Sequence, residues 1–144
     1  MTDVNETEIA MTPTDARVAI VGCGLIGTAI ALAVREARCT VFVTDLNGMH
    51  EQIARERSGA VVWADEPVDL VVIATPPDAI ADAVLAAHGR CPTAAITDVA
   101  SVKAAIVEQV MAGPAGRRFV GGHPMAGSAA SGPEHAQAEL FRGR

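Results

Sequence analysis

Short apolar runs and helix-forming segments alternate along most of this chain. Apolar runs at 17–21, 40–44, 60–63, 69–74, 94–97 and 119–121 predict six strands. Helical patterns lie between them, at 25–37, 48–58, 78–88 and 101–111, and Gly89 is expected to end the third helix. This alternation predicts an α/β fold of the Rossmann type: a doubly wound, mainly parallel six-stranded sheet with helices on both faces.

The first 15 residues differ in composition from the rest of the 144-residue chain. They have no apolar periodicity, no Lys or Arg, and four of the acidic residues behind the net charge of −6. We expect a disordered acidic leader at 1–15 and one domain at 16–144. The domain itself is close to neutral, so no basic surface for nucleic acid is predicted.

Cysteine and histidine spacing adds little chemistry. Cys23, Cys39 and Cys91 form no CxxC pair, which favours reduced thiols in a cytoplasmic protein, and neither residue type has metal-ligand spacing. The uncharged run at 18–34 is shorter than the roughly 20 residues of a membrane span. Because glycines lie at its centre, a strand, a turn and a helix explain it better, and no membrane segment is predicted.

A glycine motif opens the first helix. Gly22-Cys23-Gly24-Leu25-Ile26-Gly27 fits G-x-G-x-x-G between a predicted strand and a predicted helix. Gly22 permits the tight turn, Gly24 allows a pyrophosphate to approach, and Gly27 lets helix and strand pack closely. The free N–H groups of the first turn, including those of Leu25 and Ile26, would face the phosphates. The alternative is a tight turn that binds nothing.

Two further segments extend the predicted cofactor site. Asp45 follows the second strand, 18 residues after Gly27, near the offset of the acid that binds an adenosine ribose. A carboxylate there favours NAD over NADP, and no Lys or Arg lies within 46–52; alternatively, Asp45 caps the next helix. Thr75 and Pro76 end the fourth strand, where they form either a rigid wall for the ligand or a plain turn.

The candidate chemistry lies near the end of the chain. His123 follows a glycine pair and precedes a proline, so a group that titrates near neutral pH is held in a constrained loop. Alternatively, the backbone of that loop satisfies the imidazole. Ser101 follows the fifth strand, where it faces the cleft, caps the next helix, or does both. Lys103 is predicted to be a solvated helix residue.

Four segments together resemble one enzyme family. They are GCGLIGTAIA, VIATPP, TDVASVK and GGHPMAGSAASGPEHAQAELFRGR. Through them the chain, from Arg17 to its end, is similar to the N-terminal nucleotide-binding domain of the prephenate and arogenate dehydrogenases of tyrosine biosynthesis. The glycine loop is generic, whereas HPMAG, its pairing with DVASVK, and the later ELFRG are far more specific.

The resemblance implies a reaction and residue roles. The family carries out NAD(P)-dependent oxidative decarboxylation of a cyclohexadienyl acid: the C4 carbinol loses hydride, the ring carboxylate leaves as CO₂, and the ring becomes aromatic. His123 would be the general base for the C4 hydroxyl proton. Ser101 would orient that hydroxyl and the histidine. Ser128 would line the substrate pocket, or else only cap a turn.

Two departures bear on what the resemblance implies. Many members carry an acidic residue where this chain has Ala129, so any role of that acid in shaping the pocket is not carried over. The family also continues, past the position of Arg144, into a helical domain that supplies the dimer interface and further substrate contacts. We therefore expect the domain of an NAD-dependent prephenate dehydrogenase, poorly active by itself and homodimeric in its full-length form.

Three alternatives remain open on the sequence. The substrate is arogenate, which differs by an amino group in place of a keto group. Or the chain belongs to another Rossmann dehydrogenase, such as a β-hydroxyacid dehydrogenase or a pyrroline-carboxylate reductase, in which HPMAG is not expected. Or the chain is a non-catalytic module that senses NAD(H).

Overall fold

One parallel sheet organises the computed structural model, which describes residues 16–126 and 130–143. Its strands are β1 (Arg17–Val21), β2 (Thr40–Thr44), β3 (Val61–Val62), β4 (Leu70–Ile73), β5 (Ala95–Asp98) and β6 (Phe119–Val120). They lie in the order β3-β2-β1-β4-β5-β6, and every pair is parallel. The predicted doubly wound fold is confirmed, with each strand within two residues of its predicted bounds. The predicted leader at 1–15 lies outside the described residues.

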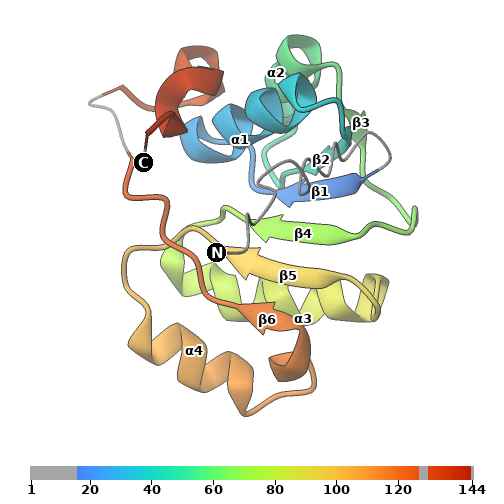
Figure 1. Ribbon diagram of the computed structural model, residues 1–144, viewed down its shortest axis with the longest axis vertical. Helices are drawn as coiled ribbons and strands as arrows, with labels where there is room; N and C mark the ends of the chain where they lie inside the picture. Colours follow the sequence, from blue (N-terminus) through green and yellow to red (C-terminus); the bar gives the residue numbers. More distant parts are fainter. Residues whose placement is uncertain (1–15, 127–129, 144) are drawn as a thin grey trace, which may run out of the picture.

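Helices cover both faces of this sheet. They are α1 (Leu25–Glu36), α2 (Gly48–Ser58), α3 (Ile80–Arg90) and α4 (Ala104–Met111), with short 3₁₀ turns η1 (Pro77–Ala79) and η2 (Gly116–Arg118). Alternate residues of β1 face opposite layers: Val18 and Ile20 pack in the cluster under α1 and α2, and Ala19 packs in the cluster under α3 and α4. Figure 1 shows α1 and α2 beside β1 and β2, and α3 and α4 beside the later strands.

The third helix differs from its prediction at both ends. It begins at Ile80 after the turn η1, and it runs through Gly89 to Arg90, so the prediction that Gly89 ends it is wrong. A glycine stop needs a positive φ, which Gly89 does not have. Instead the helix ends where Cys91 enters the core: its thiol donates to the Val68 carbonyl oxygen at 3.6 Å. No helix within the described ranges is long and apolar enough to cross a membrane.

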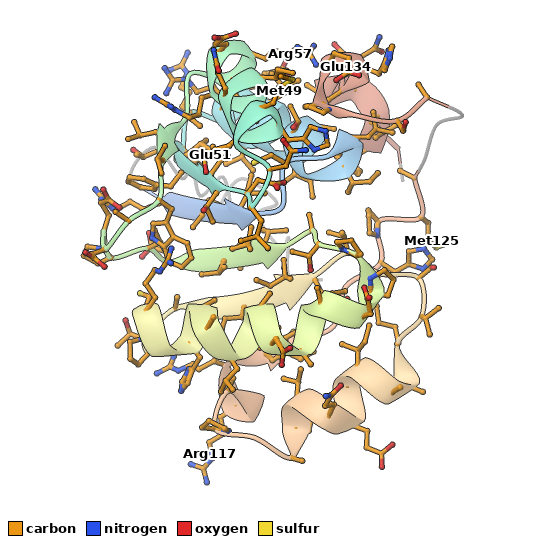
Figure 2. The ribbon with its side chains drawn as sticks, turned by 180° about the vertical axis from the view of Figure 1, so that it is seen from behind. Met49, Glu51, Arg57, Arg117, Met125 and Glu134 are labelled. Carbon is orange, nitrogen blue, oxygen red and sulfur yellow. The ribbon has the colours of Figure 1, made fainter. Side chains whose placement is uncertain are left out.

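The end of the chain returns to the first half of the fold. After β6 it runs past the carboxyl ends of the strands, and two 3₁₀ turns, η3 (Pro133–His135) and η4 (Ala138–Phe141), pack on α1 and α2 (Figure 1). Arg57 Nη1 donates to the buried Pro133 carbonyl oxygen at 2.7 Å, and Figure 2 shows Arg57 and Glu134 together at this contact. The described residues 130–143 are thereby held against α1 and α2.

Candidate active site

Close backbone contacts hold the glycine turn between β1 and α1. Gly22 has a φ of +102°, and its N–H donates to the Thr44 carbonyl oxygen at 2.9 Å. A Cβ at Gly22 would lie 2.6 Å from the Ala74 carbonyl oxygen, and a Cβ at Gly27 would lie 1.8 Å from the Gly22 carbonyl oxygen. Both positions therefore exclude any residue larger than glycine.

The amino end of α1 faces open space. Its N-cap, Gly24, brings no side-chain cap, no acidic residue lies in the first turn, and a Cβ at Gly24 would meet nothing within 4 Å. The first bond here runs from the Thr28 N–H to the Gly24 carbonyl oxygen, so the N–H groups of Leu25, Ile26 and Gly27 precede the helical ladder. A pyrophosphate fits this place, because it needs backbone donors, room and no competing negative charge.

Asp45 connects the end of β2 to the glycine turn. Its Oδ2 accepts from the Cys23 N–H at 2.6 Å, and its Oδ1 accepts from the Asn47 N–H at 2.7 Å. The alternative that Asp45 caps the next helix is wrong, because Asn47 Oδ1 accepts from the N–H groups of Met49 and His50. Asp45 stays partly buried beside the turn, and each of its oxygens keeps a lone pair for a further donor.

The thiol within the glycine motif has a structural role. Cys23 is fully buried and donates to the Thr44 carbonyl oxygen at 3.7 Å. Burial, and then the charges of Asp45 and Glu51, raise the pKa of the Cys23 thiol to about 12. The thiol therefore stays protonated at neutral pH and offers no nucleophile to the site.

Thr75 and Pro76 lie against the glycine turn. The Ala74 N–H donates to the Val21 carbonyl oxygen at 2.7 Å, and a Cβ at Gly22 would come within 2.9 Å of the Thr75 N. Thr75 is partly buried, Pro76 is exposed, and the turn η1 follows directly. Thr75 and Pro76 connect β4 to the helical segment that follows, and they also border the glycine turn. The structure is therefore compatible with either predicted role.

One buried carboxylate joins the loops of His123 and Ser101, and it was missing from the sequence prediction. Asp98, the last residue of β5, is 1% exposed. Its Oδ1 accepts from the Gly122 N–H at 3.1 Å, and its Oδ2 accepts from the Ala100 N–H at 3.1 Å. These two donors directly precede His123 and Ser101, so one side chain fixes the backbone ahead of both. Its signal in the sequence was an acid at the end of an apolar strand.

Lys103 completes this buried arrangement. Its Nζ forms an ion pair with Asp98 Oδ2, and its side chain is only 27% exposed, so the prediction of a solvated helix residue is wrong. A Cβ at Gly121 would touch Lys103 Cδ at 3.5 Å, and a Cβ at Gly122 would lie 2.6 Å from the Asp98 carbonyl oxygen. The glycine pair before His123 therefore lets that loop pack closely on the loop of Ser101.

The side chains of His123 and Ser101 are exposed, and neither hydrogen-bonds to another described residue. The described backbone thus provides no partner for the imidazole. Ser101 does not cap α4, which begins at Ala104 with Lys103 as its N-cap, because the residues before it form the loop around Asp98. Ser128 lies outside the described residues, as does position 129. Within 16–126 and 130–143, no three potential ligands are grouped around a metal position.

The strand register brings the two parts of the site to one level. Val21, Ile73 and Asp98 are aligned across β1, β4 and β5, and each is the last residue of its strand. Two strand spacings separate Val21 from Asp98, about 10 Å. The glycine turn and the loop of Ser101 therefore start from the same row at the carboxyl edge. The loop of His123 leaves β6 one residue earlier, at Val120 beside Thr97, and the Gly122 N–H bonds to Asp98 in that row.

Known sequences similar to this chain point to one family. The family model for the prephenate dehydrogenase, nucleotide-binding domain matches residues 30–144. A probable prephenate dehydrogenase, NovF, of Streptomyces niveus is 38% identical over 127 residues, which is 87% of this chain and 35% of that protein. The prephenate dehydrogenase of Bacillus subtilis (strain 168) is 33% identical over 135 residues, which is 85% of this chain and 36% of that protein. The chain spans about a third of the length of these relatives.

Solved structures give the same result. Prephenate dehydrogenase from A. aeolicus, in complex with hydroxyphenyl propionate and NAD⁺, has 27% identity and a TM-score of 0.80 over 89% of this chain and 48% of that one. Synechocystis arogenate dehydrogenase has 30% identity and a TM-score of 0.77 over 86% of this chain and 46% of that one. The chain belongs to the prephenate dehydrogenase family and has that family's nucleotide-binding domain.

Proposed function

We propose that this chain binds NAD at the carboxyl edge of its sheet and brings His123 to the oxidative decarboxylation of prephenate. The observation that carries the proposal is that the last residues of β1, β4 and β5 are aligned, so that the glycine turn and the two loops bound to Asp98 meet at one edge of the sheet. In open α/β sheets, ligands bind outside the carboxyl ends of the strands.

The cofactor fits the residues of the first half of the fold. The pyrophosphate would rest on the amino end of α1, at Gly24, Leu25 and Ile26. Asp45 would accept hydrogen bonds from the adenosine ribose and repel a 2′-phosphate, which supports NAD rather than NADP. Thr75 and Pro76 would border the nicotinamide.

The residues of the second half would handle the proton. When bound, NAD supplies the hydride acceptor. His123, exposed at the end of its loop, would accept the C4 hydroxyl proton as the ring loses CO₂ and becomes aromatic. Ser101 would orient the hydroxyl, and Ser128 would contact the substrate. Asp98 has a positioning role in this scheme, because it binds the backbone N–H groups that directly precede Ser101 and His123.

Two measurements test the proposal. Calorimetric titration of this chain with NAD should give saturable binding, and His123→Asn should leave that affinity within about twofold. In the longest natural form of the protein that contains this chain, the same variant should lower the rate of NADH formation from prephenate by about 10²–10⁴-fold. Absence of NAD binding would refute the cofactor site. An unchanged rate would refute the role of His123 as the base, and NAD binding without NADH formation by the unaltered protein would support the sensing module.

Arogenate is the second candidate substrate, because the similar Synechocystis enzyme is an arogenate dehydrogenase. A comparison of kcat/KM for the two acids decides between them. A homodimer and a cytoplasmic location complete the proposal; the second is supported by the buried thiols of Cys23 and Cys91, neither of which is in a disulfide.

A further inference from the structure

We propose that Glu51 is a second carboxylate that, together with Asp45, excludes the 2′-phosphate of NADP from this nucleotide site. The inference rests on the proposed function, since it concerns the adenosine end of the same cofactor. It assigns a role in the choice between NAD and NADP to Glu51, which lies in the first turn of α2 and outside the glycine motif.

The geometry places Glu51 directly behind the ribose-binding position. Its Oε2 accepts from the Asp45 N–H at 3.2 Å, and the two Asp45 oxygens accept from Cys23 and Asn47. Glu51 is partly buried, and Figure 2 shows it on the side of α2 toward the strands. Its charge is felt as far as the Cys23 thiol, whose pKa it helps to raise.

The amino ends of α1 and α2 differ in every feature that decides anion binding. A helix start attracts anions through its free N–H groups and its dipole, so the start of α2 could in principle accept a 2′-phosphate. At α1 the N-cap has no side chain and the first turn has no acid. At α2, Asn47 occupies the N–H groups of Met49 and His50, and Glu51 adds a negative charge. The start of α1 is therefore suited to bind a phosphate, whereas the start of α2 is not.

Asp45 and Glu51 lie at the start of α2, whereas the arginines of this helix, Arg55 and Arg57, lie in its last turn. The segment 46–52 contains neither residue type. Arg57 lies nine residues after the helix start, about 13 Å along the axis, and it donates to Pro133 in the C-terminal segment. A phosphate beside Asp45 would therefore meet two negative charges and no Lys or Arg partner from 46–52.

Glu56 provides a matched control on the same helix. It is exposed and accepts from Gln52 Nε2 at 2.8 Å, one turn further from Asp45. Glu51→Gln and Glu56→Gln remove the same charge from α2, and a glutamine at 51 keeps an oxygen to accept from the Asp45 N–H. Any difference between the two variants therefore reports the position of the charge.

The test is calorimetric titration of this chain and its variants with NAD and with NADP. Glu51→Gln should tighten NADP binding about tenfold, as expected for one partly screened unit charge, and should change the NAD Kd by less than about threefold. Asp45→Asn should also raise relative NADP affinity, and Glu56→Gln should shift neither Kd by more than about twofold. Raising the salt concentration should shrink the Glu51→Gln effect.

The outcomes separate the inference from the proposed function. Failure of the unaltered chain to bind NAD refutes the proposed function itself. Normal NAD binding with a Glu51→Gln effect no larger than that of Glu56→Gln refutes the role of Glu51 alone. Equal weakening of both cofactors by Glu51→Gln also refutes it, because that result indicates only local support of the β2–α2 loop.

Discussion

The buried carboxylate of Asp98 gives a prediction about stability that can be worked from its contacts. Asp98→Ala removes the acceptor for the N–H groups of Gly122 and Ala100 and for the Lys103 ammonium. Removal of one partner from a buried ion pair costs about 3–5 kcal/mol. Because Lys103 is 27% exposed and can turn toward water, we expect the lower end, about 3 kcal/mol. Asp98→Asn should cost about 1.5 kcal/mol, since it keeps one oxygen acceptor and loses the charge.

Urea unfolding followed by Trp63 fluorescence measures this loss, because Trp63 is the single tryptophan and is 3% exposed. With a slope of about 2 kcal/mol per molar urea, Asp98→Ala should lower the midpoint by about 1.5 M. Asp82→Asn, an exposed acid in the first turn of α3, is the control and should cost no more than about 0.5 kcal/mol. The Gly122 amide should also exchange faster in Asp98→Ala. Equal midpoints for the two variants would refute the reasoning.

Three further predictions concern the glycine motif. Gly27→Ala should destabilise the fold by about 3 kcal/mol or more, because its Cβ would lie 1.8 Å from the Gly22 carbonyl oxygen. Gly24→Ala, whose Cβ meets nothing within 4 Å, should unfold at an unchanged urea midpoint and weaken NAD binding instead; the reverse ranking would contradict the geometry. The raised pKa of Cys23, about 12 against an ordinary 9.0, means that the unfolded chain releases this proton first, so stability falls as pH rises above 9. Cys23→Ser should remove about 1.4 kcal/mol of the decrease in the free energy of unfolding at pH 10. If the variant and the unaltered chain show the same dependence of stability on pH, the ionisation of this thiol does not change on unfolding.

The parallel sheet and the helix layers follow from local patterns, which is why the sequence predicted them. Each strand is an apolar run of a few residues, and each connection is a helix, so the right-handed crossover rule leaves few topologies. The predicted bounds of α2 agree with the structure to the residue, and Asn47 and Gly59 cap its two ends. Gly89 was interpreted as a similar end signal, but α3 continues through it to Arg90. The C-terminal end of this helix depends on a tertiary contact, the burial of Cys91.

The candidate site was predictable only where its residues are neighbours in sequence. The glycine turn is such a case, since G-x-G-x-x-G carries its own geometry. Asp98 and Lys103 were missed because their roles depend on Gly122, 24 residues after Asp98, folding back onto β5. A spacing of five between an acid and a lysine does not reveal a buried pair. The loss of the Ser101 cap has the same origin, since the loop around Asp98 delays the start of α4.

The division of the site between two halves of the sheet has a consequence for how its variants should behave. Most of the proposed cofactor residues lie in the turn between β1 and α1 and directly after β2, and Thr75 and Pro76 follow β4. The proposed proton-handling residues lie on loops after β5 and β6. Between them lies β4, whose end contacts the glycine turn through Ala74 and aligns with Asp98 through Ile73. The two halves are therefore connected through the aligned ends of β1, β4 and β5, and no hydrogen bond between described side chains joins them. Substitutions near Asp45 should change cofactor affinity without changing the chemistry, and substitutions near Asp98 should change the positions of His123 and Ser101 while NAD still binds.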